Sequence, residues 1–116
     1  MDNNVQPAAQ ELNSLEMMVI KEQVSEQIRT VFDPEIPVNI YELGMIYDIG
    51  VKSDGVVDVT MTLTSPSCPA AQVIPLEVKQ KSEMVRGVKE TNVRVVWEPR
   101  WDPSMMSEEA RLTLGM

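Results

Sequence analysis

Apolar residues recur every three to five positions near the N-terminus, a spacing that places them along one side of a helix. These residues are Leu12, Leu15, Val19, Val24, Ile28 and Val31. Asn13 and Glu16 are spaced as a capping box, in which each side chain accepts a hydrogen bond from the backbone N–H of the other residue. Asp33 should end the helix, because it precedes Pro34 and a residue before proline avoids the helical conformation. We therefore expect a helix over residues 12–31.

Two later runs, 45–52 and 56–64, alternate in the way that is typical of half-buried strands. In the first run the residues on one face are Met45, Tyr47, Ile49 and Val51. In the second run Val57, Val59, Met61 and Leu63 should face the core, whereas Asp58, Thr60, Thr62 and Thr64 should face solvent. The sequence SDG between the runs contains a glycine that can adopt a positive φ. Together the two runs predict a β-hairpin.

From Pro69 onward the apolar spacing becomes helical again, although Pro75 lacks the N–H that a helix interior needs. The helix should either begin irregularly before Pro75 or kink there, and Gly87 should form its C-cap. A third strand is expected over 91–97, and its inward residues should be Val93, Val95 and Trp97.

The C-terminal segment begins as a loop and then becomes helical. Ser107 precedes two glutamates, which favour the positive end of a helix dipole, and Gly115 follows the last apolar pair. The elements therefore follow the order α-β-β-α-β-α, in which the second strand, the crossover helix and the third strand form a parallel unit. We predict an α/β (α+β) fold with a small mixed three-stranded sheet, helices on one face and an open polar face. Residues 1–11 should be a flexible tail, and residues 12–116 a single domain.

Ten basic and eighteen acidic residues give the chain a net charge of −8, and it contains one cysteine and no histidine. The acidic balance argues against nucleic acid or an anionic membrane surface as a partner. No apolar run reaches the length of a membrane span. A single thiol permits no internal disulfide, so we expect a reducing, cytoplasmic environment. The lack of histidine excludes Cys-His nucleophiles and histidine-containing metal sites.

The one cysteine, Cys68, lies between Pro66 and Pro69, where a predicted strand gives way to a predicted helix. If Pro69 is the first helical residue, Cys68 is the N-cap, and the free N–H groups there would lower the pKa of its thiol. A free cysteine is also commonly a small buried apolar residue, and spacing alone leaves both interpretations open. An iron–sulfur cluster usually takes about four protein ligands. The other ligands would have to come from a second subunit, a partner, a small thiol or an oxygen ligand such as Asp33.

Three segments together resemble the SufT-like family. They are VFDPEIPVNIYELGMIYDI (31–49), TLTSPSCP (62–69) and EPRWDPSMMSEEARLTLGM (98–116). This family comprises small accessory proteins of iron–sulfur cluster maturation, among them bacterial SUF-associated proteins and eukaryotic cytosolic cluster-targeting proteins. The resemblance implies an iron–sulfur-cluster-assembly-like domain. It also implies that Cys68 and Asp33 are the residues close to a metal, namely an iron–sulfur cluster or iron that is bound transiently.

By the same resemblance the chain is not an enzyme but an accessory factor that helps deliver or insert clusters into client apoproteins, with Cys68 as a transient ligand. Its partners would be iron–sulfur assembly proteins and client apoproteins, and a homodimer is compatible with this role. Two other hypotheses stay open. In one, the chain is a protein-interaction adaptor that docks partners through its acidic surface and the loop around Trp101, while Cys68 only caps a helix. In the other, Cys68 serves a thiol-dependent enzyme or redox sensor, although such a protein would lack a histidine base and a resolving cysteine.

Overall fold

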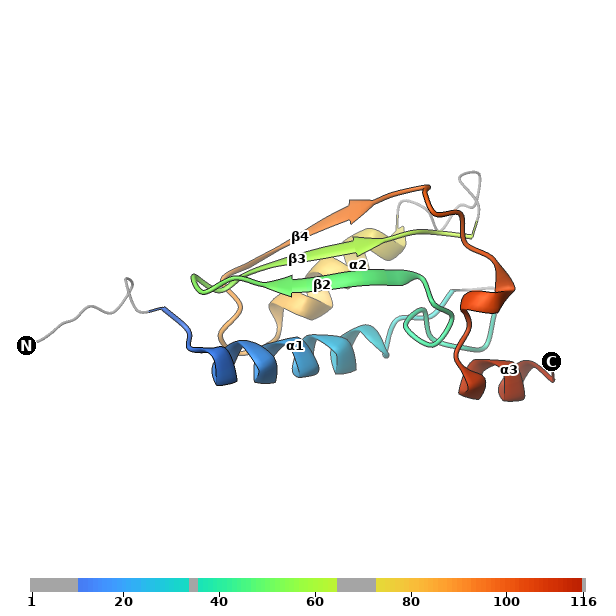
Figure 1. Cartoon of the computed structure of the whole chain (residues 1–116), viewed down its shortest axis with the longest axis horizontal. Helices are drawn as coiled ribbons and strands as arrows, with labels where there is room; N and C mark the ends of the chain where they lie inside the picture. The colour runs from blue at the N-terminus through green and yellow to red at the C-terminus, as the bar shows by residue number, and fades with distance from the viewer. Residues whose placement is uncertain (1–10, 34–35, 65–72, 116) are drawn as a thin grey trace, which may run out of the picture.

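The computed structural model describes residues 11–33, 36–64 and 73–115 (Figure 1). The elements in this part of the chain are α1 (Ser14–Ile28), β2 (Ile46–Val51), β3 (Val56–Met61), α2 (Val73–Glu83), β4 (Glu90–Val95), the 3₁₀ helix η2 (Pro103–Met105) and α3 (Glu108–Leu114). The sheet has the order β2-β3-β4. β2 and β3 are antiparallel, and β3 and β4 are parallel. The predicted mixed α/β fold is therefore confirmed, while the predicted tail, residues 1–11, lies almost entirely outside the described residues.

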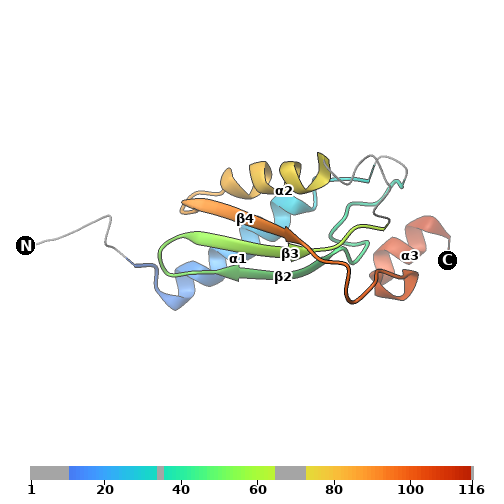
Figure 2. The ribbon, with the colours of Figure 1, turned by 90° about the horizontal axis from the view of Figure 1, so that it is seen from above.

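The two longer helices, α1 and α2, cover the same face of the sheet, and the opposite face is open (Figures 1 and 2). The open face carries Asp58, Thr60, Asn92 and Arg94. Lys52 and Asn92 both contact the Asp58 carboxylate, at 3.2 Å and 3.3 Å, and these hydrogen bonds lower its pKa. In the described part of the chain, no helix is both long and apolar enough to cross a lipid bilayer.

Helix α1 begins at the predicted capping box but buries a narrower face than its sequence predicts. The Glu16 N–H donates to Asn13 Oδ1 at 2.8 Å, and the Asn13 N–H donates to Glu16 Oε1 at 2.9 Å. Ile20, Val24 and Ile28 are buried against the sheet, whereas the side chains of Leu15 and Val19 are 68% and 47% exposed. The expectation that Leu15 and Val19 belong to the core face was wrong, because they lie at the surface beside Arg86 and Gly87.

The β2–β3 hairpin has the predicted turn, in which Gly55 adopts a φ of 92°. The four predicted inward residues of the second run, Val57, Val59, Met61 and Leu63, are all buried. Thr62 was expected to face solvent, but it is fully buried. The regular strand ends at Met61, and the Thr62 N–H donates to the Met45 carbonyl at 2.8 Å, so the alternation of faces does not continue past the strand.

One detail of α2 concerns Pro75, for which the sequence left two alternatives open, and two further details of α2 and β4 differ from the sequence prediction. Pro75 is the third residue of α2 in the part of the helix that the structure describes, which places it in the first described turn. Gly87 has a φ of 96° but lies beyond the end of the helix at Glu83, so it is not the C-cap. Trp97 was expected to face inward, yet it is 43% exposed because β4 ends two residues earlier.

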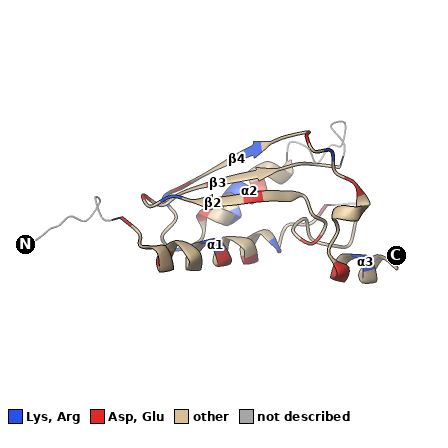
Figure 3. Cartoon of the chain, in the orientation of Figure 1, with Lys and Arg blue, Asp and Glu red and all other residues tan. Residues whose placement is uncertain are grey.

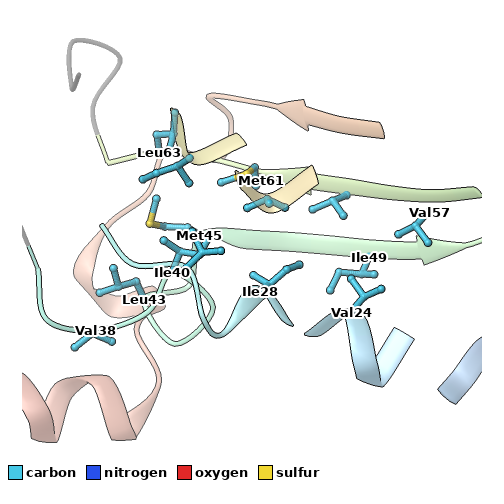
Figure 4. Packing of buried hydrophobic residues seen from close by; sticks show 14 of the residues in the cluster. Val24, Ile28, Val38, Ile40, Leu43, Met45, Ile49, Val57, Met61 and Leu63 are labelled. Carbon is cyan, nitrogen blue, oxygen red and sulfur yellow. The ribbon is translucent and has the colours of Figure 1, made fainter. Parts of the chain in front are cut away.

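A single cluster of apolar side chains fills the space between the helices and the sheet (Figure 4). Val24 and Ile28 come from α1, and Val57 and Met61 come from β3. The segment before β2 extends this core toward one end of the molecule through the buried residues Val38, Ile40, Leu43 and Met45. The loops at that end are therefore held on a packed base.

Candidate functional site

The end of α1, the start of β2, the ends of β3 and β4 and the start of α3 meet at one end of the molecule (Figure 1). Several backbone hydrogen bonds join these segments. The Ser107 N–H donates to the Glu42 carbonyl at 2.8 Å, and the Val96 N–H donates to the Met61 carbonyl at 2.8 Å. This end of the fold thus brings together residues 39–45, 62–64 and 96–107, which are far apart in the sequence.

Glu42 links helix α1 to the start of α3. Its carboxylate Oε2 accepts a hydrogen bond from Arg29 Nε at 3.1 Å, and the Ser107 hydroxyl also donates to the carboxylate. These hydrogen bonds, first from Ser107 and then from Arg29, lower the pKa of Glu42, while the bond to Glu42 raises the pKa of Arg29. The Arg29 guanidinium also lies 4.1 Å from the centroid of the Tyr41 ring, within the range of a cation–π contact.

We expect Glu42→Gln to destabilise the protein by about 1 kcal/mol at neutral pH, because it weakens charged hydrogen bonds at a half-buried position. The pKa of Glu42 is lowered on folding, so its stabilising contribution is complete above its ordinary value of 4.5 and is lost as the pH falls through the folded pKa. Urea unfolding should therefore show a larger difference from wild type at pH 7 than at pH 3. The exposed control Glu26→Gln should show no difference at either pH, and an equal loss at both pH values for Glu42→Gln would contradict the assignment.

Gly44 lets the C-terminal segment approach the turn before β2. It adopts a φ of 84°, and a Cβ atom at this position would overlap the backbone carbonyl of Met105. The next contact along this interface is made by Trp101, whose indole Nε1–H donates to the Leu43 carbonyl at 2.7 Å. A glycine at position 44 is therefore required both for the backbone conformation and for the close approach.

A second group of hydrogen bonds fixes the loop after β4. The Tyr47 hydroxyl donates to the Pro99 carbonyl at 2.7 Å and lies 3.5 Å from Met105 Sδ. Burial raises the pKa of the Tyr47 phenol, and a hydrogen bond from Thr62 acts in the opposite direction. The phenol thus stays protonated near neutral pH and remains a hydrogen-bond donor to the loop.

These contacts border a pocket of about 440 Å³. Its lining residues are Thr62, Leu63, Thr64, Trp97, Glu98, Arg100 and Trp101. One wall is the chain that follows β3, and the other is the loop that follows β4. The wall after β3 continues in sequence directly into residues 65–72, which include Cys68 and lie outside the described residues.

Comparison with known proteins identifies the family and the fold of the chain. Residues 21–95 match the model of a family described as iron-sulfur cluster assembly protein. The chain belongs to this family. A Porphyromonas gingivalis protein named Fe-S protein maturation auxiliary factor is 52% identical over 100 residues, which cover 86% of this chain and 95% of that relative.

Two further relatives support the family assignment. The Staphylococcus aureus protein named Fe-S protein maturation auxiliary factor SufT is 40% identical over 86 residues, which cover 74% of this chain and 98% of the relative. The crystal structure of a domain of unknown function, DUF59, from Bacillus anthracis matches with a TM-score of 0.82 and 35% identity, covering 90% of this chain and 99% of that chain. The SufT-like resemblance of the sequence is therefore confirmed.

The two site residues predicted for this family member are not both described. Asp33 is buried, with 5% of its surface exposed, and its carbonyl accepts a hydrogen bond from the Ile36 N–H at 3.2 Å. Cys68 lies outside the described residues, as does Glu35, the acid that follows Asp33 and Pro34. Among the described residues there is no group of three Cys, Asp or Glu side chains arranged to hold a metal ion. The pairing of Cys68 with Asp33 stays a prediction.

Sequence reasoning found Trp101 but not the residues that position it. The sequence left open whether Trp101 docks partners or packs on the core edge, and its half-buried ring and its hydrogen bond to Leu43 favour packing. Tyr47 and Glu42 were not singled out, because their partners lie 52 and 65 positions away, at Pro99 and Ser107. No local spacing rule can reveal contacts over such separations.

Proposed function

We propose that this protein is an accessory factor in iron–sulfur cluster maturation that helps place clusters in client apoproteins, with Cys68 as a transient ligand. Family membership supports the proposal, as do the names of relatives that cover most of the chain. The structural observation that carries it is the pocket described above. One of its walls is formed by Thr62–Thr64, and Cys68 follows this wall closely in the sequence. The role is non-catalytic, the partners are assembly proteins and client apoproteins, and the compartment is the cytoplasm.

The residue types suit temporary rather than permanent binding of the cluster. Cys68 supplies one soft sulfur ligand and Asp33 one carboxylate, whereas a cluster usually takes about four protein ligands. The remaining positions on iron stay available to a client's cysteines or to a small thiol. A cluster held in this way can be passed on by exchange of ligands, because the client offers more sulfur ligands than the carrier does.

Anaerobic reconstitution with iron and sulfide tests the proposal. We expect Cys68→Ser to lower bound iron, labile sulfide and the rate of client activation at least about fivefold, because it replaces the only thiol in the chain. Asp33→Asn should lower bound iron to a smaller extent. Asp48→Asn, a change at an exposed carboxylate on β2, is the matched control and should leave all three quantities unchanged.

The outcome separates the proposal from the adaptor hypothesis. If Cys68→Ser matches wild type in its visible spectrum, its metal content and its activation of clients, direct ligation is wrong. Full partner binding and full client activation in that variant would then support an adaptor. Such an adaptor would use Trp97 rather than Trp101 as its accessible aromatic residue, because Trp97 is the more exposed of the two.

A further inference from the structure

β4 lies at the edge of the sheet, and its backbone groups alternate between β3 and the outside. The Val96 N–H donates to the Met61 carbonyl, so the even-numbered residues direct their backbone groups toward β3. Successive residues of a strand direct these groups to opposite sides. Thr91, Val93 and Val95 therefore present their N–H and C=O groups on the outer edge.

The first part of this edge is closed by side chains of α2. Lys79 Nζ donates to the Thr91 carbonyl at 2.7 Å, and the Thr91 N–H donates to Glu83 Oε2 at 3.0 Å. Lys79 and Glu83 also bond to each other at 2.7 Å. Both outward groups of Thr91 are thus satisfied, which is one way in which proteins protect an edge strand from pairing with other chains.

The second part of the edge is not closed in this way. In the part of the chain that the structure describes, the outward groups of Val93 and Val95 have no hydrogen-bond partner. Seen from above, α2 and β4 diverge toward this end of the sheet (Figure 2). The other edge strand, β2, has a shift of register between Ile46 and Asp48, which disturbs the regular row of outward groups at its start. The edge at Val93–Val95 is therefore the better template for an added strand.

We propose that the outer edge of β4 at Val93–Val95 binds an extended segment of a client apoprotein by strand addition. The inference rests on the proposed function, since it identifies the client's point of contact. Backbone N–H and C=O groups at every second residue match an extended chain, whatever its side chains are. Only two residues offer such groups, so the contact is short and readily released. The same edge leads to Trp97, so a bound segment would lie beside the pocket.

Charge favours a client segment over a second copy of this chain. Arg94 is exposed between Val93 and Val95 and is the basic position of β4, coloured blue in Figure 3. An antiparallel pair of two copies centred on this edge would place the two Arg94 side chains opposite each other, and like charges in that arrangement are destabilising. A client segment that carries an acidic residue opposite Arg94 is instead attracted.

The experiment measures binding of two cluster-free probes, apo-ferredoxin and a hydro-lyase whose [4Fe–4S] cluster has been removed. Val95→Pro deletes an outward N–H that makes no bond to β3, a substitution that an edge strand tolerates. We expect it to weaken binding about tenfold, and Val95→Ala, the matched control that keeps the N–H, to weaken it less than about threefold. Val93→Pro and Val93→Ala form a second pair, and Arg94→Glu should weaken binding about fivefold. Circular dichroism and reconstitution with iron and sulfide check that each variant folds and still loads clusters.

The outcomes separate this inference from the proposed function. In wild type, binding of a probe should slow amide hydrogen exchange at Val93 and Val95. If both proline variants bind a probe as tightly as wild type does, strand addition is wrong while the proposed function stands. If wild type binds neither probe, both strand addition and the proposed function are wrong. If the protein alone forms dimers that Val95→Pro dissolves, the edge serves a second copy, and the client proposal is overturned. If Arg94→Glu binds the probes as tightly as wild type does, the claim that the client segment carries an acidic residue opposite Arg94 is wrong.

Discussion

Gly44→Ala should destabilise the protein by roughly 3 kcal/mol, the sum of a positive φ in a residue with a Cβ atom and a steric overlap with backbone. The added methyl would meet the Met105 carbonyl, which cannot rotate away as a side chain could. The segment that carries η2 would have to separate from the turn before β2. We therefore expect the midpoint of thermal unfolding to fall by roughly 10 °C.

Gly50→Ala is the matched control for this prediction. Gly50 lies in β2, has no positive φ, and a Cβ atom there would meet its nearest neighbours at 3.9 Å, which is ordinary contact. The free energy of unfolding of the Gly50→Ala variant should stay within about 0.5 kcal/mol of wild type. Both variants can be compared by urea unfolding and by limited proteolysis of the C-terminal segment. Equal stability of the two alanine variants would mean that the contact between Gly44 and Met105 does not hold this segment in place.

Trp101→Ala should also cost roughly 3 kcal/mol, because it removes a large half-buried ring and leaves the Leu43 carbonyl without its donor. Trp97→Ala should cost less than about 1 kcal/mol, since the Trp97 side chain is 43% exposed. Both residues line the same pocket, so both variants change its shape, whereas only Trp101→Ala should lower the free energy of unfolding strongly. Comparing the two variants therefore separates an effect on stability from an effect on the pocket. The measurement is the free energy of unfolding in urea for each variant.

The two tryptophan variants also bear on function. Each widens the pocket beside the segment that leads to Cys68, so each should slow client activation even where stability is kept. A Trp101→Ala protein as stable as wild type would show that the hydrogen bond to Leu43 does not anchor the loop after β4. A Trp97→Ala protein that is as unstable as Trp101→Ala would show that the two rings have the same structural role.

Local patterns were sufficient to predict most of the fold. The capping box at Asn13, the SDG turn and the helix start at Ser107 depend on residues within a few positions of each other, and all three are present. The alternation along β3 was also read correctly, because its inward residues meet a continuous core. The parallel pairing of β3 with β4 followed from the helix between them.

The prediction failed where a contact from a distant segment decides the outcome. Thr62 is buried because the chain leaves the strand and bonds to Met45. Trp97 is exposed because β4 ends before it, whereas Trp101 turns inward to bond to Leu43. For the site, resemblance to a family predicted that Asp33 lies close to a metal, but its burial was not predicted. The bonds of Glu42 and Tyr47 could not be anticipated from spacing.

The position of β3 in the middle of the sheet affects how the chain emerges during synthesis. Its antiparallel partner β2 comes before it, but its parallel partner β4 follows only after residues 62–89. A parallel partner always needs such a crossover. A ribosome-bound chain that ends before Glu90 therefore exposes one whole side of Val56–Met61 to neighbouring nascent chains, and translation pauses in this interval should promote aggregation.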